Sequence, residues 1–205
     1  MKGRFIVVYG MNNLGKTTAT TSLVEQLNKQ GTKTEYLKYP VYEIESGKRL
    51  NAYLRNGNPE SLTVEQAQKL FAQNRRDYEG ELTQLLNSGI TVIAEDYVGT
   101  GIAWGLIFGV SLEKLQEFNK GLLEPDVAVL LDGERFSTGH EGNHKHEGVS
   151  AEDWRKGREI HQRLAGRFGW KTVRANQERE AVLSDLVDLV ASVTVEGNRG
   201  SIEVC

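Results

Sequence analysis

The chain has 205 residues, 39% of them hydrophobic, and a formal net charge of −3 at pH 7, which suits one domain with a substantial core. The slightly acidic balance argues against a nucleic-acid polymer or an anionic membrane as the main partner, and no apolar run is long enough to cross a membrane. Cys205 is the only cysteine and an apolar run begins at residue 5, so we expect no disulfide, no signal peptide and a reducing, cytoplasmic location.

The first predicted elements flank a glycine-rich turn. Residues 4–9 form a short apolar run typical of a buried strand, and residues 16–30 have apolar side chains at helical spacing. Between them, the sequence Gly-Met-Asn-Asn-Leu-Gly-Lys-Thr has the spacing of a phosphate-binding loop. Backbone N–H groups at a helix N-terminus attract phosphate, Lys16 can reach the outer phosphates, and the Thr17 hydroxyl can bind Mg²⁺. The pattern predicts that a nucleoside triphosphate contacts the loop residues Gly10, Asn12, Asn13, Gly15, Lys16, Thr17 and Thr18.

Strands and helices alternate along the rest of the chain. Further strands are expected over residues 33–39, 90–94, 127–131 and 170–174. Further helices are expected over residues 63–88, 101–108, 111–120, 150–167 and 178–193, the first of them opened by a Thr63–Gln66 capping box. Strands about one helix apart imply parallel pairing with helices on both faces. We therefore predict an α/β fold of the P-loop NTPase class with a five-stranded parallel sheet, one domain over residues 1–195 and a polar tail over residues 196–205.

Four further segments give the chain a family resemblance. They are Lys38-Tyr39-Pro40, the run Leu-Phe-Ala-Gln-Asn-Arg over residues 70–75, Glu95-Asp96-Tyr97, and Glu124-Pro125-Asp126. With the phosphate loop, their order and spacing resemble the thymidylate kinase family of nucleoside monophosphate kinases from residue 5 to about residue 190. The resemblance implies transfer of the γ-phosphoryl group of ATP, with Mg²⁺, to dTMP or a related deoxynucleotide. Because family members are commonly dimers, it also implies a homodimer.

The resemblance assigns roles to several side chains of the acceptor site. Phe71 would stack on the acceptor base, and Arg75 would hydrogen-bond its edge. Tyr39 would line the acceptor pocket, and Tyr97 would lie against the deoxyribose and disfavour a 2′-hydroxyl. Without the resemblance, the helical spacing of Phe71 would indicate a core residue. Arg75 and Arg76 are adjacent and cannot point the same way, so one can remain exposed to solvent while the other points into a cleft.

The chain departs from the family where arginines normally hold the acceptor phosphate. The family's Asp-Arg pair reads Glu95-Asp96 here, and the arginine that often follows Pro40 by two residues is Tyr42. Another cation must then neutralise the phosphate, and we expect Asp96 to turn away from it. We assign Lys48 to the substrate site, because a helix from residue 47 would carry Lys48 and Arg55 on one face. The candidate cations are Lys48, Arg49, Arg55, Arg76, Lys145, Arg155 and Arg158.

Acidic residues that follow strands are candidates for the metal site, because ligands of such sheets bind at the carboxyl ends of the strands. We expect Thr17 and Glu95 to hold Mg²⁺ or its bound water, with Asp96 as a competitor for Glu95. Asp132 could serve Mg²⁺ or cap a turn. The predicted catalytic residues are Lys16, which we expect to be solvated without a ligand, Glu95 and Arg135.

Residues 133–149 lie where the family has its lid, and their glycines suit a mobile cover over the triphosphate. Arg135 and Lys145 would contact phosphates from the lid, and Glu147 resembles the acidic residue that ends the family's lid motif. His140, His144 and His146 with Glu141 could bind zinc or nickel, but we favour neutral, hydrogen-bonding histidines in so glycine-rich a segment. His161 is expected on the surface or in helix packing.

Two alternatives remain open. A related kinase with an unphosphorylated deoxynucleoside as acceptor would explain the missing arginines, and a non-catalytic nucleotide-binding module would be the degenerate outcome of the same losses. The intact Lys16 and Thr17 favour catalysis over the module. Phe71 and Arg75 favour a nucleotide or nucleoside kinase over a P-loop ATPase of another class.

Overall fold

The computed structural model describes residues 2–137 and 150–196, with side chains described up to residue 192. Most of the expected lid and most of the expected tail therefore lie outside the described residues. Five strands form one sheet in the order β2-β3-β1-β4-β5, and all four neighbouring pairs are parallel. The strands are β1 (Phe5–Tyr9), β2 (Thr34–Lys38), β3 (Thr91–Glu95), β4 (Val127–Asp132) and β5 (Lys171–Arg174). The predicted five-stranded parallel sheet is confirmed.

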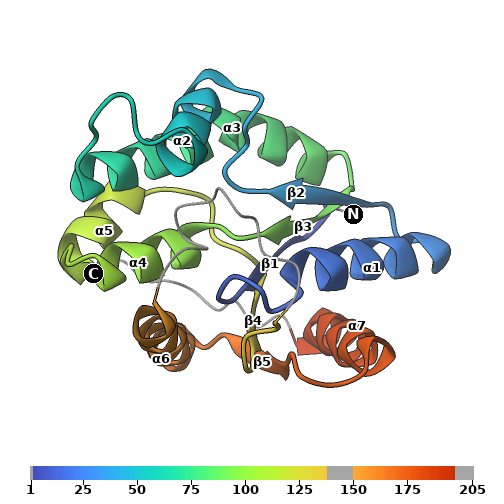
Figure 1. Cartoon of the computed structure of the whole chain (residues 1–205). Coiled ribbons are helices and arrows are strands. Elements are labelled where there is room, and N and C mark those ends of the chain that lie inside the picture. The colour runs from blue at the N-terminus through green and yellow to red at the C-terminus, as the bar shows by residue number, and fades with distance from the viewer. Residues whose placement is uncertain (1, 138–149, 197–205) are drawn as a thin grey trace.

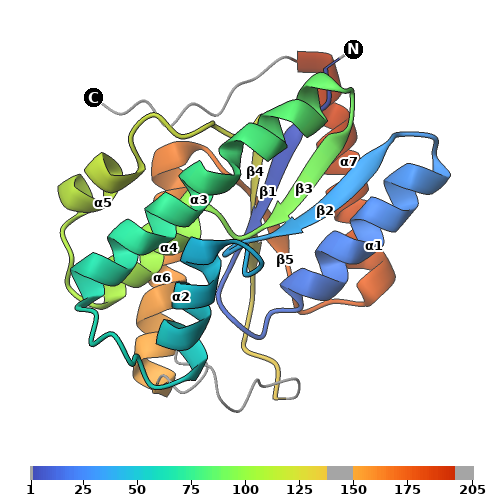
Figure 2. The ribbon, with the colours of Figure 1, turned by 90° about the horizontal axis from the view of Figure 1, so that it is seen from above.

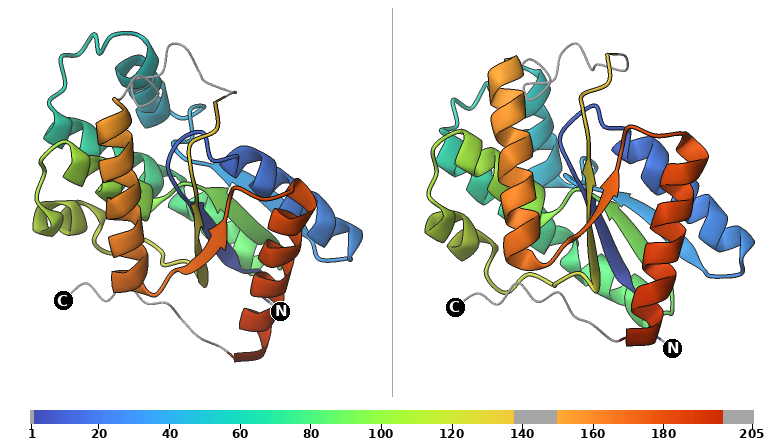
Figure 3. Two further views of the ribbon diagram at one scale, coloured as in Figure 1. Left: turned by 60° about the horizontal axis from the view of Figure 1, so that its bottom comes forward. Right: turned by 90° about the horizontal axis from the view of Figure 1, so that it is seen from below.

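Helices cover both faces of the sheet. In Figures 1 and 2, α1 and α7 lie on one side of the strands, and α3, α4 and α6 lie on the other. The view from below in Figure 3 shows α6 and α7 on opposite sides of β4 and β5. The helices are α1 (Lys16–Lys29), α2 (Glu45–Arg55), α3 (Val64–Asn87), α4 (Val98–Ile107), α5 (Leu112–Asn119), α6 (Ala151–Phe168) and α7 (Arg179–Glu196). In the described part of the chain, no helix has the length and apolar character needed to cross a membrane.

The strands β1 and β3 lie in the middle of the sheet, and their sequences are mostly apolar, as buried strands require. Every residue of β1 and β3 is buried, as expected for strands covered by helices on both faces. In the register of the sheet, Val7 lies opposite Ala94 on one side and Ala128 on the other. This order brings the carboxyl ends of β1, β3 and β4 together at one edge, where the loops that follow them meet.

Side-chain caps are found at the starts of α3 and α6, and the capping box at α3 was predicted. At α3, the Gln66 amide donates to the Thr63 hydroxyl at 3.2 Å and the Thr63 amide donates to the Gln66 side chain at 2.8 Å. At α6, Ser150 accepts from the Asp153 amide at 3.0 Å.

Helix α4 begins three residues earlier than the predicted start at residue 101. Its glycines made a helical start there difficult to predict, because glycine is a poor helix former. These glycines allow close packing instead. A Cβ on Gly105 would lie 2.4 Å from Leu115 of α5, and one on Gly101 would lie 2.6 Å from the Arg75 guanidinium.

Candidate functional site

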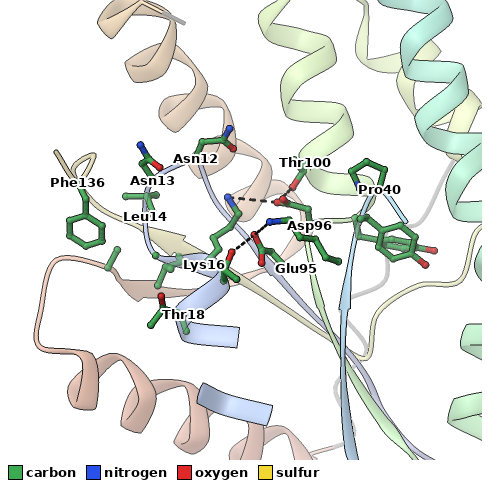
Figure 4. A pocket seen from close by; sticks show the side chains of 18 of the residues that line it. Asn12, Asn13, Leu14, Lys16, Thr18, Pro40, Glu95, Asp96, Thr100 and Phe136 are labelled. Carbon is green, nitrogen blue, oxygen red and sulfur yellow. Dashed lines mark hydrogen bonds and ion pairs between the residues drawn. The ribbon is translucent and has the colours of Figure 1, made fainter. Parts of the chain in front are cut away.

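The candidate site is a cavity of about 690 Å³ at the carboxyl ends of the strands. Its lining comes from the phosphate loop, the segments after β2 and β3, helices α2 and α3, and the start of α7. Figure 4 shows the side chains of the phosphate loop on one side of the view, with Glu95 and Asp96 next to Lys16 and an ion pair between Lys16 and Asp96. The cavity therefore extends from the predicted triphosphate loop to the predicted acceptor side chains.

The phosphate loop has backbone angles that its residue types permit. Gly10, Asn13 and Gly15 have φ values of 148°, 61° and 76°. Glycine adopts positive φ without strain and asparagine tolerates it. A Cβ on Gly10 would also lie 2.5 Å from the Leu131 carbonyl oxygen. Because Gly15 is the N-cap of α1 and has no side chain to cap it, the first N–H groups of the helix are available to an anion.

Lys16 is buried, so the expectation of a solvated lysine is wrong. Only 6% of the residue is exposed. Its Nζ donates to the Met11 carbonyl oxygen at 3.0 Å and lies 3.9 Å from Asp96 Oδ1. A carbonyl of the loop itself and an acidic side chain thus solvate the ammonium group in place of water.

Glu95 is at the centre of a polar cluster. The Thr17 hydroxyl donates to Oε1 at 3.0 Å, the Tyr36 hydroxyl donates to Oε2 at 2.6 Å, and Lys38 Nζ lies 3.2 Å from Oε1. Burial alone would raise the pKa of Glu95, but Lys16, Lys38 and the two hydroxyl donors outweigh burial and hold that pKa below its usual value. Glu95 is therefore ionised at neutral pH.

The Thr17 and Glu95 oxygens suit a magnesium ion. A hydroxyl and a carboxylate are hard oxygen ligands, and here they lie within hydrogen-bond distance of each other. Sequence reasoning missed Tyr36 and Lys38 as members of this cluster. The pairing of β2 with β3 explains their presence, because Lys38 lies opposite Glu95 and Tyr36 opposite Ile93.

Asp96 faces Lys16 of the phosphate loop, with its Oδ1 3.9 Å from the Lys16 Nζ. It has a φ of 64° and lines the cavity. Its Oδ1 accepts from the Thr100 hydroxyl at 2.7 Å, on the first turn of α4. Burial raises the pKa of Asp96, an effect that Lys16 reduces and the Glu95 carboxylate reinforces. The carboxylate that replaces the family's arginine is thus held next to the lysine of the loop.

The predicted base-binding side chains line the far half of the same cavity. Phe71 belongs to a small apolar cluster separate from the main core, and its ring packs edge-on against Tyr53 with centroids 6.4 Å apart. Arg75 is buried, and its guanidinium donates to Asn119 Oδ1 at 2.8 Å and to the Tyr97 carbonyl oxygen at 2.9 Å. Arg76 points elsewhere and donates to the Lys120 carbonyl oxygen at 3.1 Å. Arg75 is therefore the buried arginine of the adjacent pair, and Arg76 is the exposed one.

Tyr39 and Tyr97 form one wall of this half. Both are buried, and their rings lie 5.0 Å apart. Neither hydroxyl has a hydrogen-bond partner among the described residues. Both tyrosines line the cavity, where their rings rather than their hydroxyls are the larger surface for a ligand.

Of the candidate cations on α2, only Arg55 lines the cavity. Its guanidinium carbon lies 4.8 Å from the centre of the Tyr42 ring, and its Nη1 donates to Asn51 Oδ1 at 3.0 Å. The Lys48 side chain is 66% exposed and forms an ion pair with Glu45 at 3.6 Å. Arg49 is paired with Glu60 at 2.6 Å. The structure thus favours Arg55 over Lys48 as the cation on this side.

Asp132 and Arg158 form an ion pair. Arg158 Nε donates to Asp132 Oδ1 at 2.8 Å, and the same arginine contacts Glu134. The Gln162 amide donates to the other Asp132 oxygen at 2.9 Å. Burial tends to raise the pKa of Asp132, but these partners hold it below the usual value. Asp132 is thus an ion-pair partner of Arg158, and a hydrogen bond from the Gly133 backbone also helps to lower its pKa.

Only the first residues of the expected lid are described. The Phe136 amide donates to the Asn13 carbonyl oxygen at 3.0 Å, which holds the chain after β4 against the phosphate loop, and Arg135 is the preceding residue. Arg155 of α6 is exposed and bonds the Ala151 carbonyl oxygen. The remaining lid candidates Lys145, Glu141, Glu147, His140, His144 and His146 lie outside the described residues.

His161 takes part in helix packing and is not on the surface. The residue is 1% exposed, and its Nδ1 lies 2.8 Å from the Gly157 carbonyl oxygen. Burial lowers the pKa of His161 to about 4. The imidazole is therefore neutral at physiological pH.

Comparisons with known proteins agree with this geometry. A family model described as thymidylate kinase matches residues 8–186. The thymidylate kinase of Schizosaccharomyces pombe is 29% identical over 202 residues, covering 95% of this chain and 94% of the relative. That of Plasmodium falciparum is 30% identical over 203 residues, covering 95% and 93%. A solved structure of the Candida albicans thymidylate kinase superposes with a TM-score of 0.82 at 22% identity, over 94% of this chain and 93% of the other, which supports the fold.

Proposed function

The chain belongs to the thymidylate kinase family and is an ATP-dependent phosphotransferase, and from that premise we propose that it transfers the γ-phosphoryl group of ATP to dTMP or a closely related deoxynucleotide. One observation carries the proposal. The phosphate-loop residues Lys16 and Thr17 line the same cavity as Phe71 and Arg75. A single cavity can thus hold the triphosphate and the acceptor next to each other, as direct transfer requires.

Lys16 supplies the charge that the transfer needs. Phosphoryl transfer depends on positioning and on neutralising negative charge on the moving group. In the proposal, the Lys16 ammonium exchanges the Met11 carbonyl and Asp96 for phosphate oxygens, while the N–H groups at the start of α1 hold the triphosphate. Arg135, which directly precedes the residue bonded to the loop, contributes a second charge from the lid.

Thr17 and Glu95 would hold Mg²⁺ in this site. A magnesium ion held there would supply positive charge that offsets the negative charge of the phosphates. Tyr36 and Lys38 keep Glu95 ionised and fix its orientation. Tyr36 and Lys38 would therefore influence the metal site indirectly, through their contacts with Glu95.

The acceptor base would stack on Phe71 and receive a hydrogen bond from Arg75. A guanidinium only donates, so it favours a base with a carbonyl oxygen at that edge, as thymine has. Tyr39 and Tyr97 would enclose the sugar, which leaves little room for a 2′-hydroxyl. Arg55 takes the place of the Lys48 assignment as the cation for the acceptor phosphate, because it lines the cavity and stacks on Tyr42, the residue that replaces one of the family's arginines.

A deoxynucleoside acceptor is the second candidate. The observation that favours it is the Asp96 carboxylate, which lies next to Lys16 where the family has a phosphate-binding arginine. Two acids beside an acceptor dianion are repulsive, whereas an unphosphorylated hydroxyl would not meet that repulsion.

A panel assay decides between these acceptors. ADP formation is measured with ATP and Mg²⁺ against dTMP, dUMP, dCMP, dGMP, dAMP, thymidine and deoxyuridine at equal concentrations. The proposal expects the highest kcat/KM with dTMP. Preference for thymidine would select the second candidate, and ATP binding without any transfer would select the non-catalytic module.

The broader expectations from the resemblance belong to the same proposal. They are a lid over residues 133–149 that closes on the bound triphosphate, a homodimer, a single domain over residues 1–195 and a cytoplasmic location. Hydrogen exchange with and without ATP tests the lid, because closure must protect its amides. Light scattering coupled to gel filtration tests the dimer.

A further inference from the structure

Gln68 is a buried polar side chain that faces the cavity without a partner. It is 4% exposed, lies on α3 and lines the acceptor half of the cavity. Its carboxamide makes no hydrogen bond within the described part of the chain, and neither amide atom is among the fully buried polar atoms, so the amide is accessible from the cavity. A carboxamide that faces a ligand cavity and has no protein partner can use both its donor and its acceptor groups on a ligand.

The other polar side chains of α3 at the cavity, Asn74 and Arg75, already hydrogen-bond protein groups, and only Arg75 Nε has no partner among the described residues. Asn74 accepts from the Val41 amide and donates to the Val41 carbonyl oxygen, both at 2.9 Å. Arg75 is anchored to Asn119 and to the Tyr97 carbonyl oxygen. Among the polar residues of this helix that line the cavity, Gln68 is therefore the one with its full donor and acceptor capacity left for a ligand.

The position of Gln68 on the helix places it beside the expected base. Phe71 follows it by three residues and Arg75 by seven, so all three lie on one face of α3. Phe71 lies between the other two along the helix axis. A base stacked on Phe71 has Arg75 on one side and Gln68 on the other.

A carboxamide has an N–H donor next to a carbonyl acceptor. The imide edge of thymine and uracil has an N3–H donor between two carbonyl oxygens. We propose that Gln68 is a specificity-determining residue that reads the imide edge of a keto-pyrimidine, accepting from N3–H and donating to O2, while Arg75 donates to O4. This inference rests on the proposed function and extends it to a second base-reading side chain.

Gln68→Met tests the proposal, because methionine keeps the length of the side chain and removes its hydrogen bonds. Gln84→Met is the matched control, an exposed glutamine near the C-terminal end of the same helix. We expect Gln68→Met to raise the KM for dTMP about tenfold, with the KM for ATP unchanged, because one to two net hydrogen bonds are lost.

A second substrate identifies the edge that is read. dTMP methylated at N3 cannot donate from that nitrogen, and wild type should use it on the order of a hundredfold less well than dTMP, since a polar site rejects an analogue that leaves its groups unpaired. Gln68→Met should reduce this discrimination about tenfold. Gln84→Met should leave it as in wild type.

Melting temperatures separate ligand recognition from a structural role. Because the amide has no partner in the protein, Gln68→Met should leave the melting temperature of the free chain unchanged or raise it. The rise in melting temperature on adding dTMP should be smaller than in wild type. A structural role would instead lower the melting temperature of the free chain.

The outcomes distinguish this inference from the proposed function. If wild type prefers dTMP and Gln68→Met matches Gln84→Met in KM and in discrimination, the inference fails while the proposed function stands. If wild type accepts purine monophosphates and no thymine or uracil nucleotide, both fail.

Discussion

The two halves of the cavity differ in how far their polar groups are already satisfied by the protein. In the donor half, formed by the phosphate loop and the Glu95–Asp96 pair, Lys16 bonds Met11, Thr17 bonds Glu95, and Asp96 bonds Thr100. In the acceptor half, formed by α2, α3 and the start of α4, the Gln68 amide faces the cavity without a hydrogen bond to the described residues, whereas the Tyr39 and Tyr97 hydroxyls are buried behind their rings. A ligand in the donor half must exchange existing contacts, whereas a ligand in the acceptor half can bond the Gln68 amide without displacing a protein partner.

Lys16→Ala should have the largest effect and tests the donor half. It removes the cation that faces the outer phosphates, so turnover should fall by a factor on the order of a hundred or more. Steady-state rates measure the loss, and circular dichroism verifies the fold. Lys29→Ala, at the exposed end of the same helix, is the control and should retain wild-type turnover. Near-normal turnover in a folded Lys16→Ala chain would refute the assignment.

Arg55→Met tests the cation of the acceptor half. Loss of a charge-assisted bond to phosphate should raise the acceptor KM roughly tenfold to a hundredfold and leave the KM for ATP nearly unchanged. Lys48→Met, on the same helix but turned to solvent, should change the acceptor KM by less than about twofold. If the two variants behave alike, Arg55 is not the replacement for the missing arginines.

Tyr36→Phe tests the hydrogen bond from the Tyr36 hydroxyl to Glu95, which lies between the donor and acceptor halves of the cavity. The Tyr36 hydroxyl helps to lower the pKa of Glu95, so its removal raises that pKa. Glu95 must be ionised to hold Mg²⁺, and the acid limb of the kcat profile should therefore move to higher pH. The half-saturating Mg²⁺ concentration should rise about threefold. Tyr78→Phe is the control, because Tyr78 lies on α3, where its ring contacts Tyr39 and not Glu95. An unchanged acid limb in Tyr36→Phe would exclude the proposed support.

Arg158→Met should have the smallest effect on activity, because Arg158 is engaged with Asp132 and Glu134 rather than with either half. The pKa of Asp132 is lowered, so its ionised form stabilises the folded state above a pH of about 4, and that stability is lost as the pH falls through the lowered value. The variant should melt about 2–4 °C lower than wild type at pH 7, with a smaller difference near pH 3.

The KM values of Arg158→Met for ATP and for the acceptor are measured in addition to its melting temperature. Both KM values should stay within about twofold of wild type, as for a removed ion pair outside the site. An acceptor KM raised more than in Arg55→Met would instead make Arg158 the phosphate ligand.

The fold and the donor loop were predictable because their signals are local. The strand, the glycine turn and the helix that make the phosphate loop are contiguous, and the apolar runs of β1 and β3 mark them as central strands. The burial of Lys16 was not predictable, because it depends on a carbonyl of its own loop and on Asp96 from a distant segment.

Helical periodicity correctly placed Lys48 and Arg55 on one face of α2, but it could not show which of them lies near the cavity. Lys48 and Arg55 are seven residues apart on the same face, yet about 10 Å apart along the axis, so only the one near the C-terminal end reaches the cavity. Gln68 was missed for a related reason, since it lies among apolar residues at core spacing. Tyr36 and Lys38 required the strand order, which places β2 beside β3.

The enclosure of Arg75 limits how this pocket can change over evolution. Its guanidinium ties α3 to the start of α4 and to α5, and a Cβ on Gly101 would already collide with it. The side chain therefore cannot swing aside to accommodate an amino group in place of a carbonyl, and a cytosine or adenine nucleotide would meet a fixed donor. A stepwise change of base preference would therefore have to start with a residue other than Arg75. Replacing Arg75 would remove the hydrogen bonds that connect α3 with α4 and α5.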